Sequence, residues 1–118
     1  MNNKIYPHTV DSHTHLLEME KKGIDTHSLL TECFNNGMKA ALDAGVCEKD
    51  FDKRMEFKET FPFLYFTAGV HPSETRDIKK QLKIIDKQLE NKNIIGVGET
   101  GLDFHWDTVP SKIQKEMF

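Results

Sequence analysis

The sequence predicts one α/β domain made of four β/α units, and three observations lead to this prediction. Four short apolar runs each precede a charged segment with helical spacing. The runs end at His13, Asp43, His71 and Glu99, about 28 to 30 residues apart, which is the length of one β/α unit. The chain of 118 residues also has the length of one ordinary domain, so we treat residues 1–118 as a single unit.

The first two units are predicted from residues 9–45. Residues 9–13 predict a strand, after which apolar residues recur at helical spacing: Leu29, Leu30, Cys33 and Phe34. Asp25 or Thr26 is placed to cap that helix, and Gly37 is placed to end it. Residues 39–45 then predict the second strand.

The last two units begin with a helix whose predicted face carries Phe51, Met55 and Lys58. Residues 63–70 predict the third strand, because they are nearly all apolar, as parallel strands covered on both faces tend to be. The clearest amphipathic helix follows, with an apolar face of Ile78, Leu82, Ile85 and Leu89. Its solvent face carries Lys79, Lys80 and Lys83. Residues 94–98 predict the fourth strand, and residues 111–118 begin another helix.

Four such units fit two architectures. One is a small, open, doubly wound sheet, and the other is half of a (β/α)8 barrel, a fold of about 250 residues. In both, functional side chains gather at the carboxyl ends of the parallel strands. Because His13, His71 and Glu99 stand at three of the four predicted strand ends, we expect them to share one edge of the sheet.

The composition excludes several classes of protein. With 37% hydrophobic and 30% charged residues, the chain is neither disordered nor fibrous. The net charge of −3 provides no general attraction for nucleic acid, so contact with a polyanion requires a local basic patch or bound cations. Cys33 and Cys47 lack C-x-x-C spacing, and we expect both as small core side chains. Without an export signal or a membrane-length apolar run, we expect a cytoplasmic protein.

The motif Asp11-Ser-His13-Thr-His15 contains two histidines suited to a metal ion. Alternate residues of a strand face the same side, about 7 Å apart, so both imidazoles can converge on one ion. Neutral imidazoles are preferred ligands of zinc, nickel, cobalt and iron. The motif is short, however, and two exposed or backbone-bonded histidines are the alternative interpretation.

A third histidine, His71, ends the third predicted strand, because Pro72 lacks the N–H that would continue the ladder. His71 therefore stands at the mouth of the sheet, or it bonds to a neighbouring loop. Residues beside the motifs are candidates to support metal ligands through hydrogen bonds: Asp11, Asp103 and His105. Two other histidines are expected at the surface or in turns: His8 and His27.

The stretch Gly96-Val-Gly-Glu99-Thr-Gly101 has the G-x-G-x-x-G pattern of a dinucleotide-binding turn. That interpretation requires a helix directly after the glycines, but Leu-Asp-Phe-His-Trp-Asp follows, with Pro110 soon after. A carboxylate in the turn would also repel a pyrophosphate. We therefore interpret the stretch as a strand end that delivers Glu99, with glycines that let the backbone pass close to a crowded metal site.

Three blocks of the sequence resemble the TatD-like metal-dependent hydrolases of the amidohydrolase superfamily. They are Asp11-Ser-His-Thr-His15-Leu16, Ala68-Gly-Val-His71-Pro72 and Gly96-Val-Gly-Glu99-Thr-Gly-Leu-Asp103-Phe104, in this order. The resemblance implies the N-terminal half of a TIM-type (β/α)8 barrel, with one or two divalent metal ions at the carboxyl ends of its strands. It also implies hydrolysis of phosphodiester bonds, with DNA or another phosphodiester as the substrate.

The resemblance further implies a role for each matching residue. His13 and His15 are the expected ligands of one metal, and Glu99 is expected to contact or bridge the metals. His71 is expected near the substrate phosphate, so Glu99 and His71 are the candidate catalytic residues. The resemblance leaves zinc, magnesium, manganese and nickel open.

The family pattern continues with two metal-binding histidines from strands five and six and an aspartate from strand eight, all of which fall after Phe118. We therefore expect a fragment of a longer polypeptide, or a half that pairs with a second copy or with a separate C-terminal half. Alone, the chain is expected to be inactive. Two alternatives stay open: a non-catalytic metal-binding or interaction half-barrel, and a hydrolase of another ester or amide.

Overall fold

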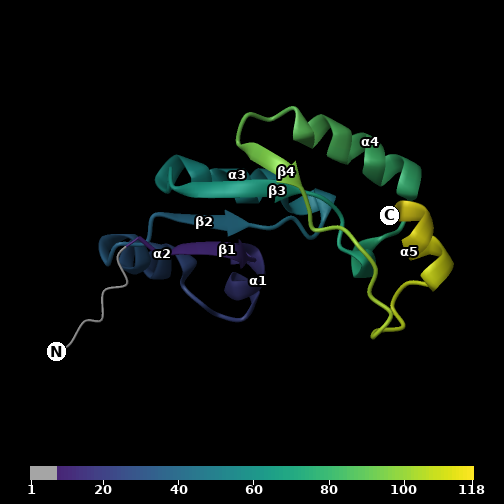
Figure 1. The fold of residues 1–118 in the computed structure, drawn as a ribbon, viewed down its shortest axis with the longest axis horizontal. Coiled ribbons are helices and arrows are strands. Elements are labelled where there is room, and N and C mark those ends of the chain that lie inside the picture. Colours follow the sequence, from purple (N-terminus) through teal and green to yellow (C-terminus); the bar gives the residue numbers. More distant parts are fainter. Residues whose placement is uncertain (1–7) are drawn as a thin grey trace.

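The structure is a computed structural model that describes residues 8–118. In chain order its elements are β1 (Val10–Thr14), α1 (Leu16–Lys21), α2 (Thr26–Asn35), β2 (Ala40–Asp43), η1 (Glu48–Asp50), α3 (Phe51–Thr60), β3 (Leu64–Ala68), η2 (Pro72–Glu74), α4 (Ile78–Leu89), β4 (Ile94–Val97) and α5 (Ser111–Met117), where η denotes a short 3-10 helix (Figure 1). All four predicted strands are present. Their ends differ from the predicted ones by about two residues or fewer, the usual uncertainty of an element boundary.

The four strands form one parallel sheet in the order β1-β2-β3-β4. A doubly wound sheet reverses its strand order at a switch point, whereas a (β/α)8 barrel keeps the order of the chain. Among the described strands there is no reversal. The fold is therefore α/β, with the architecture of a partial TIM-type barrel.

The core lies on one face of this sheet. Leu64, Phe66 and Ala41 are at most 2% exposed, and they pack in one cluster with Leu16 and Phe57 from the helices. The opposite face is open: Tyr65, between two buried neighbours, is 43% exposed, and Ile95 is 60% exposed. In a (β/α)8 barrel the second face of the sheet is filled by inward-pointing side chains, so an open apolar face is consistent with this architecture.

The buried face of α3 differs from the predicted one. Phe51, Met55 and Lys58 are only half-buried, while Arg54 and Phe57 are the buried residues of the helix. The helix is thus turned by about one residue relative to the prediction. The cause is the ion pair of Arg54 with Asp43 at the end of β2.

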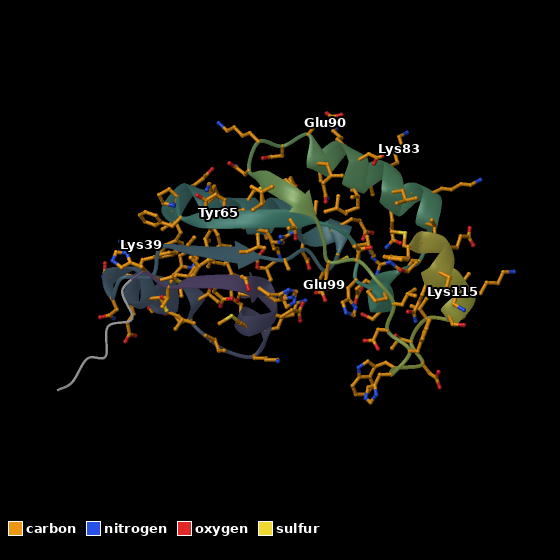
Figure 2. All side chains as sticks on the ribbon, in the orientation of Figure 1. Lys39, Tyr65, Lys83, Glu90, Glu99 and Lys115 are labelled. Atoms are coloured by element: carbon orange, nitrogen blue, oxygen red, sulfur yellow. The ribbon has the colours of Figure 1, made fainter. Side chains whose placement is uncertain are left out.

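The predicted apolar face of α4 is correct only in part. Ile85 is buried as predicted, but Leu82 is 43% exposed and the side chains of Gln81 and Gln88 are buried. Nε2 of Gln81 donates to Oε2 of Glu48 at 3.2 Å, and Nε2 of Gln88 donates to the Glu48 carbonyl at 2.7 Å. The helix therefore presents amides to η1, because the buried groups of Glu48 require donors. The lysines of the predicted solvent face are exposed, and Lys83 is labelled in Figure 2.

Helix α1 was not predicted, because a helix of six residues is too short to show a period. Other local predictions are confirmed: Asp25 caps α2 by accepting a hydrogen bond from the Ser28 backbone N–H at 3.0 Å, and Gly37 after the helix has a positive φ of 106°. Among residues 8–118, no helix is both long and apolar enough to cross a membrane.

The prediction that both cysteines lie in the core is wrong, because neither belongs to the hydrophobic cluster of the described residues. Both thiols are free and half-buried. The Sγ atom of Cys47 lies 3.4 Å from Oε2 of Glu48 and 3.4 Å from Nη2 of Arg76. Cys47 therefore belongs to a polar cluster at the surface of the protein.

Candidate metal centre

The carboxyl end of β1 presents His13, whose side chain is 52% exposed. Its backbone N–H donates to Oδ1 of Asp11 at 3.0 Å, so Asp11 stabilises the backbone on which this histidine is carried. The arrows of the four strands in Figure 1 point toward the same edge of the sheet, and His13 is the last residue but one of β1 (Val10–Thr14). The structure thus places His13 at the predicted edge of the sheet, where β1 ends.

His15 is held by the end of β2. It occupies the position before α1, where its ring Nδ1 lies 3.1 Å from the carbonyl oxygen of Ala44. The next backbone N–H, that of Leu16, donates to Oδ1 of Asp43 at 2.8 Å. Since the Ala44 oxygen can only accept, Nδ1 of a neutral His15 carries the proton and Nε2 keeps its lone pair. This arrangement is typical of a metal-binding histidine with a backbone carbonyl as its supporting partner.

A buried ion pair stabilises this support. Arg54, 4% exposed, donates from Nε to Oδ2 of Asp43, which is 1% exposed. Nη2 of Arg54 donates to the backbone carbonyls of Asp43 at 2.7 Å and Thr67 at 2.8 Å. The guanidinium therefore ties the ends of β2 and β3 together under the site. This role of Arg54 was not predicted, although an arginine between Phe51 and Phe57 on one helix face is a signal for a buried partner.

Glu99 reaches the two histidines because the chain after β4 crosses over the ends of β3 and β2. The Gly98 N–H donates to the Ala68 carbonyl at 2.9 Å, and the Glu99 N–H donates to the Gly45 carbonyl at 2.6 Å. Figure 2 shows Glu99 on the carboxyl side of the strands. A residue that follows one edge strand is thereby brought to the opposite edge strand, β1.

The close backbone approach occurs at Gly45 and Gly69, which corrects the predicted role of the glycines before Glu99. A Cβ on Gly69 would lie 2.5 Å from the Glu99 carbonyl oxygen, and one on Gly45 would lie 2.7 Å from that of Gly98. A Cβ on Gly96 would have its nearest neighbour at 3.8 Å, an ordinary contact. The glycines that permit the crossing thus follow β2 and β3 and do not lie in the G-x-G-x-x-G stretch.

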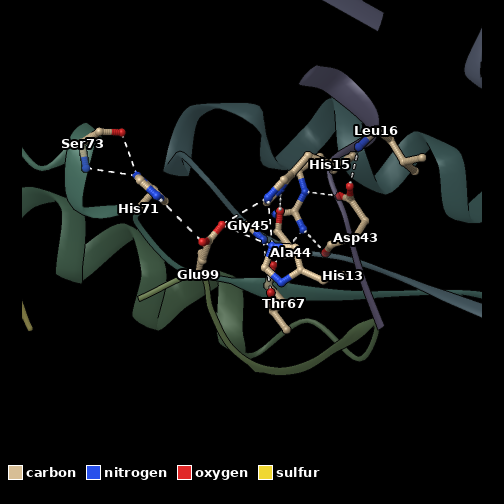
Figure 3. A network of polar contacts seen from close by, with 11 residues as sticks. His13, His15, Leu16, Asp43, Ala44, Gly45, Thr67, His71, Ser73 and Glu99 are labelled. Carbon is tan, nitrogen blue, oxygen red and sulfur yellow. Dashed lines mark hydrogen bonds and ion pairs between the residues drawn. The ribbon is translucent and has the colours of Figure 1, made fainter. Parts of the chain in front are cut away.

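The side chains of His13, His15 and Glu99 converge (Figure 3). The Nε2 atoms of the two histidines are 3.0 Å apart. Oε2 of Glu99 is 3.5 Å from Nε2 of His13 and 3.2 Å from Nε2 of His15. Two ligands about 2.1 Å from one tetrahedral ion lie about 3.4 Å apart, so these separations fit a shared cation. Two imidazoles and one carboxylate are also a ligand set that zinc and other divalent ions accept.

His71 lies beside this trio and does not belong to it. Its Nε2 is 3.8 Å from Oε1 of Glu99, the oxygen that does not face His13 and His15. On the other side of the ring, Nδ1 accepts a hydrogen bond from the Ser73 backbone N–H at 3.1 Å and lies 2.7 Å from Ser73 Oγ. His71 thus caps η2 and holds Nε2 toward the site (Figure 3).

The other predicted supporting residues lie outside the cluster. Asp103 and His105 bond to each other and to α5: the His105 N–H donates to Oδ1 of Asp103 at 3.0 Å, and the Asp103 N–H donates to Gln114 at 2.8 Å. His8 and His27 are exposed, as predicted. His27 stacks on Phe57 with ring centroids 5.0 Å apart.

A second polar cluster surrounds Glu48, whose side chain is 5% exposed. Its carboxylate contacts Nη2 of Arg76 at 3.2 Å, Nε2 of Gln81 at 3.2 Å and the thiol of Cys47 at 3.4 Å. Burial by itself would raise the pKa of Glu48, but its backbone N–H and these donors outweigh burial and hold the pKa below its usual value. The contacts of Arg76 with Cys47 and Glu48 raise the pKa of the guanidinium in turn.

Fold and site together define the class of this protein. A parallel sheet in barrel order, with two histidines and a glutamate converging beyond its strand ends, is a β/α-barrel scaffold with a candidate metal centre. The chain belongs to the family of TatD related DNases, whose model matches residues 10–118.

Curated relatives agree with this assignment. The chain is 29% identical over 109 residues to the uncharacterized metal-dependent hydrolase YabD of Bacillus subtilis (strain 168), an alignment that covers 92% of this chain and 42% of YabD. It is 27% identical over 121 residues to the uncharacterized metal-dependent hydrolase BU355 of Buchnera aphidicola subsp. Acyrthosiphon pisum (strain APS), covering 92% and 45%. The chain thus spans less than half the length of these relatives.

Proposed function

We propose that this chain provides the first metal-binding part of a metal-dependent hydrolase that cleaves phosphodiester bonds in DNA. The observation that carries the proposal is the convergence of His13, His15 and Glu99, with ligand atoms within 4.8 Å of one another, at the edge of the sheet where barrel enzymes act. The names of the relatives support metal-dependent hydrolysis, and the name of the family supports DNA as the substrate.

The residues of the chain have distinct parts in this proposal. His13 and His15 would hold a divalent ion through Nε2, with Glu99 as a third ligand or as a bridge to a second ion. A bound divalent ion supplies a water of lowered pKa and neutralises charge on phosphate oxygens. His71 directs Nε2 toward the same space and would contact the substrate. The ion also gives a chain of net charge −3 a local positive site for a polyanion.

Several features of the whole protein belong to the same proposal. The proposed cofactor is one or two divalent ions of zinc, magnesium, manganese or nickel. We propose a cytoplasmic location, and completion of the barrel by a C-terminal half or by a second copy of the chain. The open sheet face with Tyr65 and Ile95 supports a further layer of side chains on that face.

The test is hydrolysis of single-stranded DNA with manganese or magnesium, by the chain alone and with a C-terminal barrel half supplied in trans. We expect no cleavage by the chain alone. With the C-terminal half we expect cleavage that a chelator stops and that His13→Ala and Glu99→Ala abolish. His8→Asn is the matched control, because His8 lies at the other end of β1 and its φ of 71° suits asparagine. Cleavage that resists the chelator, or that survives both alanine variants, would contradict the proposal.

The same assay separates two other functions. Zinc binding without hydrolysis in either preparation would indicate a non-catalytic metal-binding domain. Cleavage of carboxylic esters or amides, but not of phosphodiesters, in a substrate panel would keep the metal chemistry and change the substrate class.

A further inference from the structure

His15 and His71 use their ring nitrogens in opposite ways. For His15, Nδ1 faces the Ala44 carbonyl oxygen at 3.1 Å, and a carbonyl can only accept a hydrogen bond. For His71, Nδ1 faces the Ser73 backbone N–H at 3.1 Å, and an N–H can only donate. When both rings are neutral, the proton of His15 is therefore on Nδ1, and the proton of His71 is on Nε2.

We propose that Ser73 is a positioning residue that fixes His71 as a hydrogen-bond donor to the substrate and keeps it from serving as a third imidazole ligand. The backbone N–H of Ser73 sets the tautomer of the neutral ring. Its hydroxyl, 2.7 Å from Nδ1, adds a second donor to the same nitrogen. Ligation through Nε2 requires a free lone pair, which the Nε2–H tautomer does not have. This inference rests on the proposed hydrolytic function.

The position of Glu99 is consistent with His13 and His15 as metal ligands and His71 as a hydrogen-bond donor. Its Oε2 faces Nε2 of His13 at 3.5 Å and Nε2 of His15 at 3.2 Å, while its Oε1 faces Nε2 of His71 at 3.8 Å. A separation of 3.8 Å is too long for a hydrogen bond, so the Nε2–H of His71 has no bonded partner in Glu99. An oxygen of a phosphodiester, which only accepts, is the ligand chemistry that this N–H would recognise.

The tautomers are tested by nitrogen-15 NMR of the chain labelled at histidine, recorded near pH 9, where a free imidazole is neutral. We expect Nδ1 to carry the proton in His15 and Nε2 to carry it in His71. On addition of zinc chloride, the Nε2 signals of His13 and His15 should move, and those of His71 should keep the pattern of a protonated Nε2. A proton on Nδ1 of His71, or a zinc-bound Nε2 in that ring, would overturn the proposal.

Variants test the positioning role itself. Ser73→Ala removes the hydroxyl, so we expect the Nδ1 signal of His71 to change. We expect kcat to fall about threefold to tenfold, because one hydrogen bond is lost, while zinc affinity stays unchanged. Ser73→Thr should restore both properties. His71→Asn is the matched control, since asparagine can still cap η2 through its short amide but has no group at the position of Nε2. It should retain zinc affinity and the fold while losing hydrolysis.

The outcomes distinguish this inference from the proposed function. If the NMR pattern is as expected but no phosphodiester is cleaved, the proposed function fails and the tautomers stand. If DNA is cleaved while Ser73→Ala leaves both the Nδ1 signal and kcat unchanged, the function stands and the Ser73 hydroxyl has no positioning role.

Discussion

Glu48 and Glu99 both follow the carboxyl ends of strands and both have polar neighbours, but the neighbours are of different kinds. The Glu48 carboxylate accepts from Arg76, Gln81 and Cys47. Glu99 instead faces Nε2 of His13 and His15, of which a neutral His15 presents a lone pair. A carboxylate surrounded by donors stabilises the fold, whereas a carboxylate that converges with imidazole nitrogens provides a place for a cation.

Asp43 resembles Glu48 in its surroundings. It is 1% exposed, and both of its carboxylate oxygens have donors, Leu16 N–H and Arg54 Nε. Asp43 therefore supports the metal centre from below without being a ligand. The two kinds of carboxylate should respond differently to substitution, because one kind contributes to folding and the other to ion binding.

The largest effect is expected for Arg54→Ala, which leaves the carboxylate of Asp43 buried without its cation. We expect the free energy of unfolding to fall by about 3–5 kcal/mol in urea denaturation. Arg76→Ala is the matched control, because the Arg76 side chain is 45% exposed whereas that of Arg54 is 5% exposed. Its loss should be about 1 kcal/mol or less. Equal losses for the two arginines would contradict the role given to burial.

Glu99→Gln should weaken metal binding and leave the stability of the fold almost unchanged. We expect zinc affinity, measured by calorimetric titration, to fall about 100-fold or more, because loss of a direct ligand costs at least as much as loss of a supporting partner. The thermal midpoint of the metal-free chain should change little. Glu90→Gln, an exposed substitution at the end of α4, is the control and should leave affinity unchanged. A strong loss of stability in the metal-free Glu99→Gln variant would show that Glu99 stabilises the fold, as Glu48 and Asp43 do.

Glu48→Gln should destabilise the fold by about 1–3 kcal/mol, because an amide cannot accept from all the donors around it. The pKa of Glu48 is lowered in the folded state from its ordinary value of 4.5. Its contribution to stability is therefore fully present above about pH 4.5 and is lost as pH falls through the lower, folded-state pKa. The difference between Glu48→Gln and the parent chain should disappear in the same window. An unchanged difference at acid pH would refute this assignment.

Gly69→Ala tests the crossing that brings Glu99 to β1. Its Cβ would lie 2.5 Å from the Glu99 carbonyl oxygen, so the crossing must shift, and we expect zinc affinity to fall about tenfold. Gly96→Ala is the matched control, because its Cβ would lie 3.8 Å from its nearest neighbour. Similar affinities of the two variants would show that the crossing does not position Glu99.

Much of the fold could be predicted from the sequence, because apolar runs and helical spacing are local patterns. The meeting of His13, His15 and Glu99 at one edge also followed from the rule that parallel strands end on the same side. The buried polar partners on α4 could not be predicted in this way. Gln81 and Gln88 replace apolar residues on α4 because Glu48, far away in the chain, requires donors. No local pattern contains that requirement.

The sequence also does not show which glycines permit the chain to cross over β2 and β3. Gly45 and Gly69 are separated from Glu99 in the sequence, and only the path of the chain over β2 and β3 makes their missing Cβ atoms necessary. The role of Ser73 has a different origin. It lies two residues after His71, but its effect depends on the direction of one backbone N–H, which residue types alone do not specify.

X-ray absorption spectroscopy of the zinc-loaded chain tests the central claim most directly. The claim is that His13, His15 and Glu99 form a metal centre to which neither Cys47 nor His71 contributes. We predict a first shell of nitrogen and oxygen with two imidazoles and no sulfur, and one imidazole after His13→Ala. Sulfur in the first shell, or two imidazoles that persist in His13→Ala, would contradict the account.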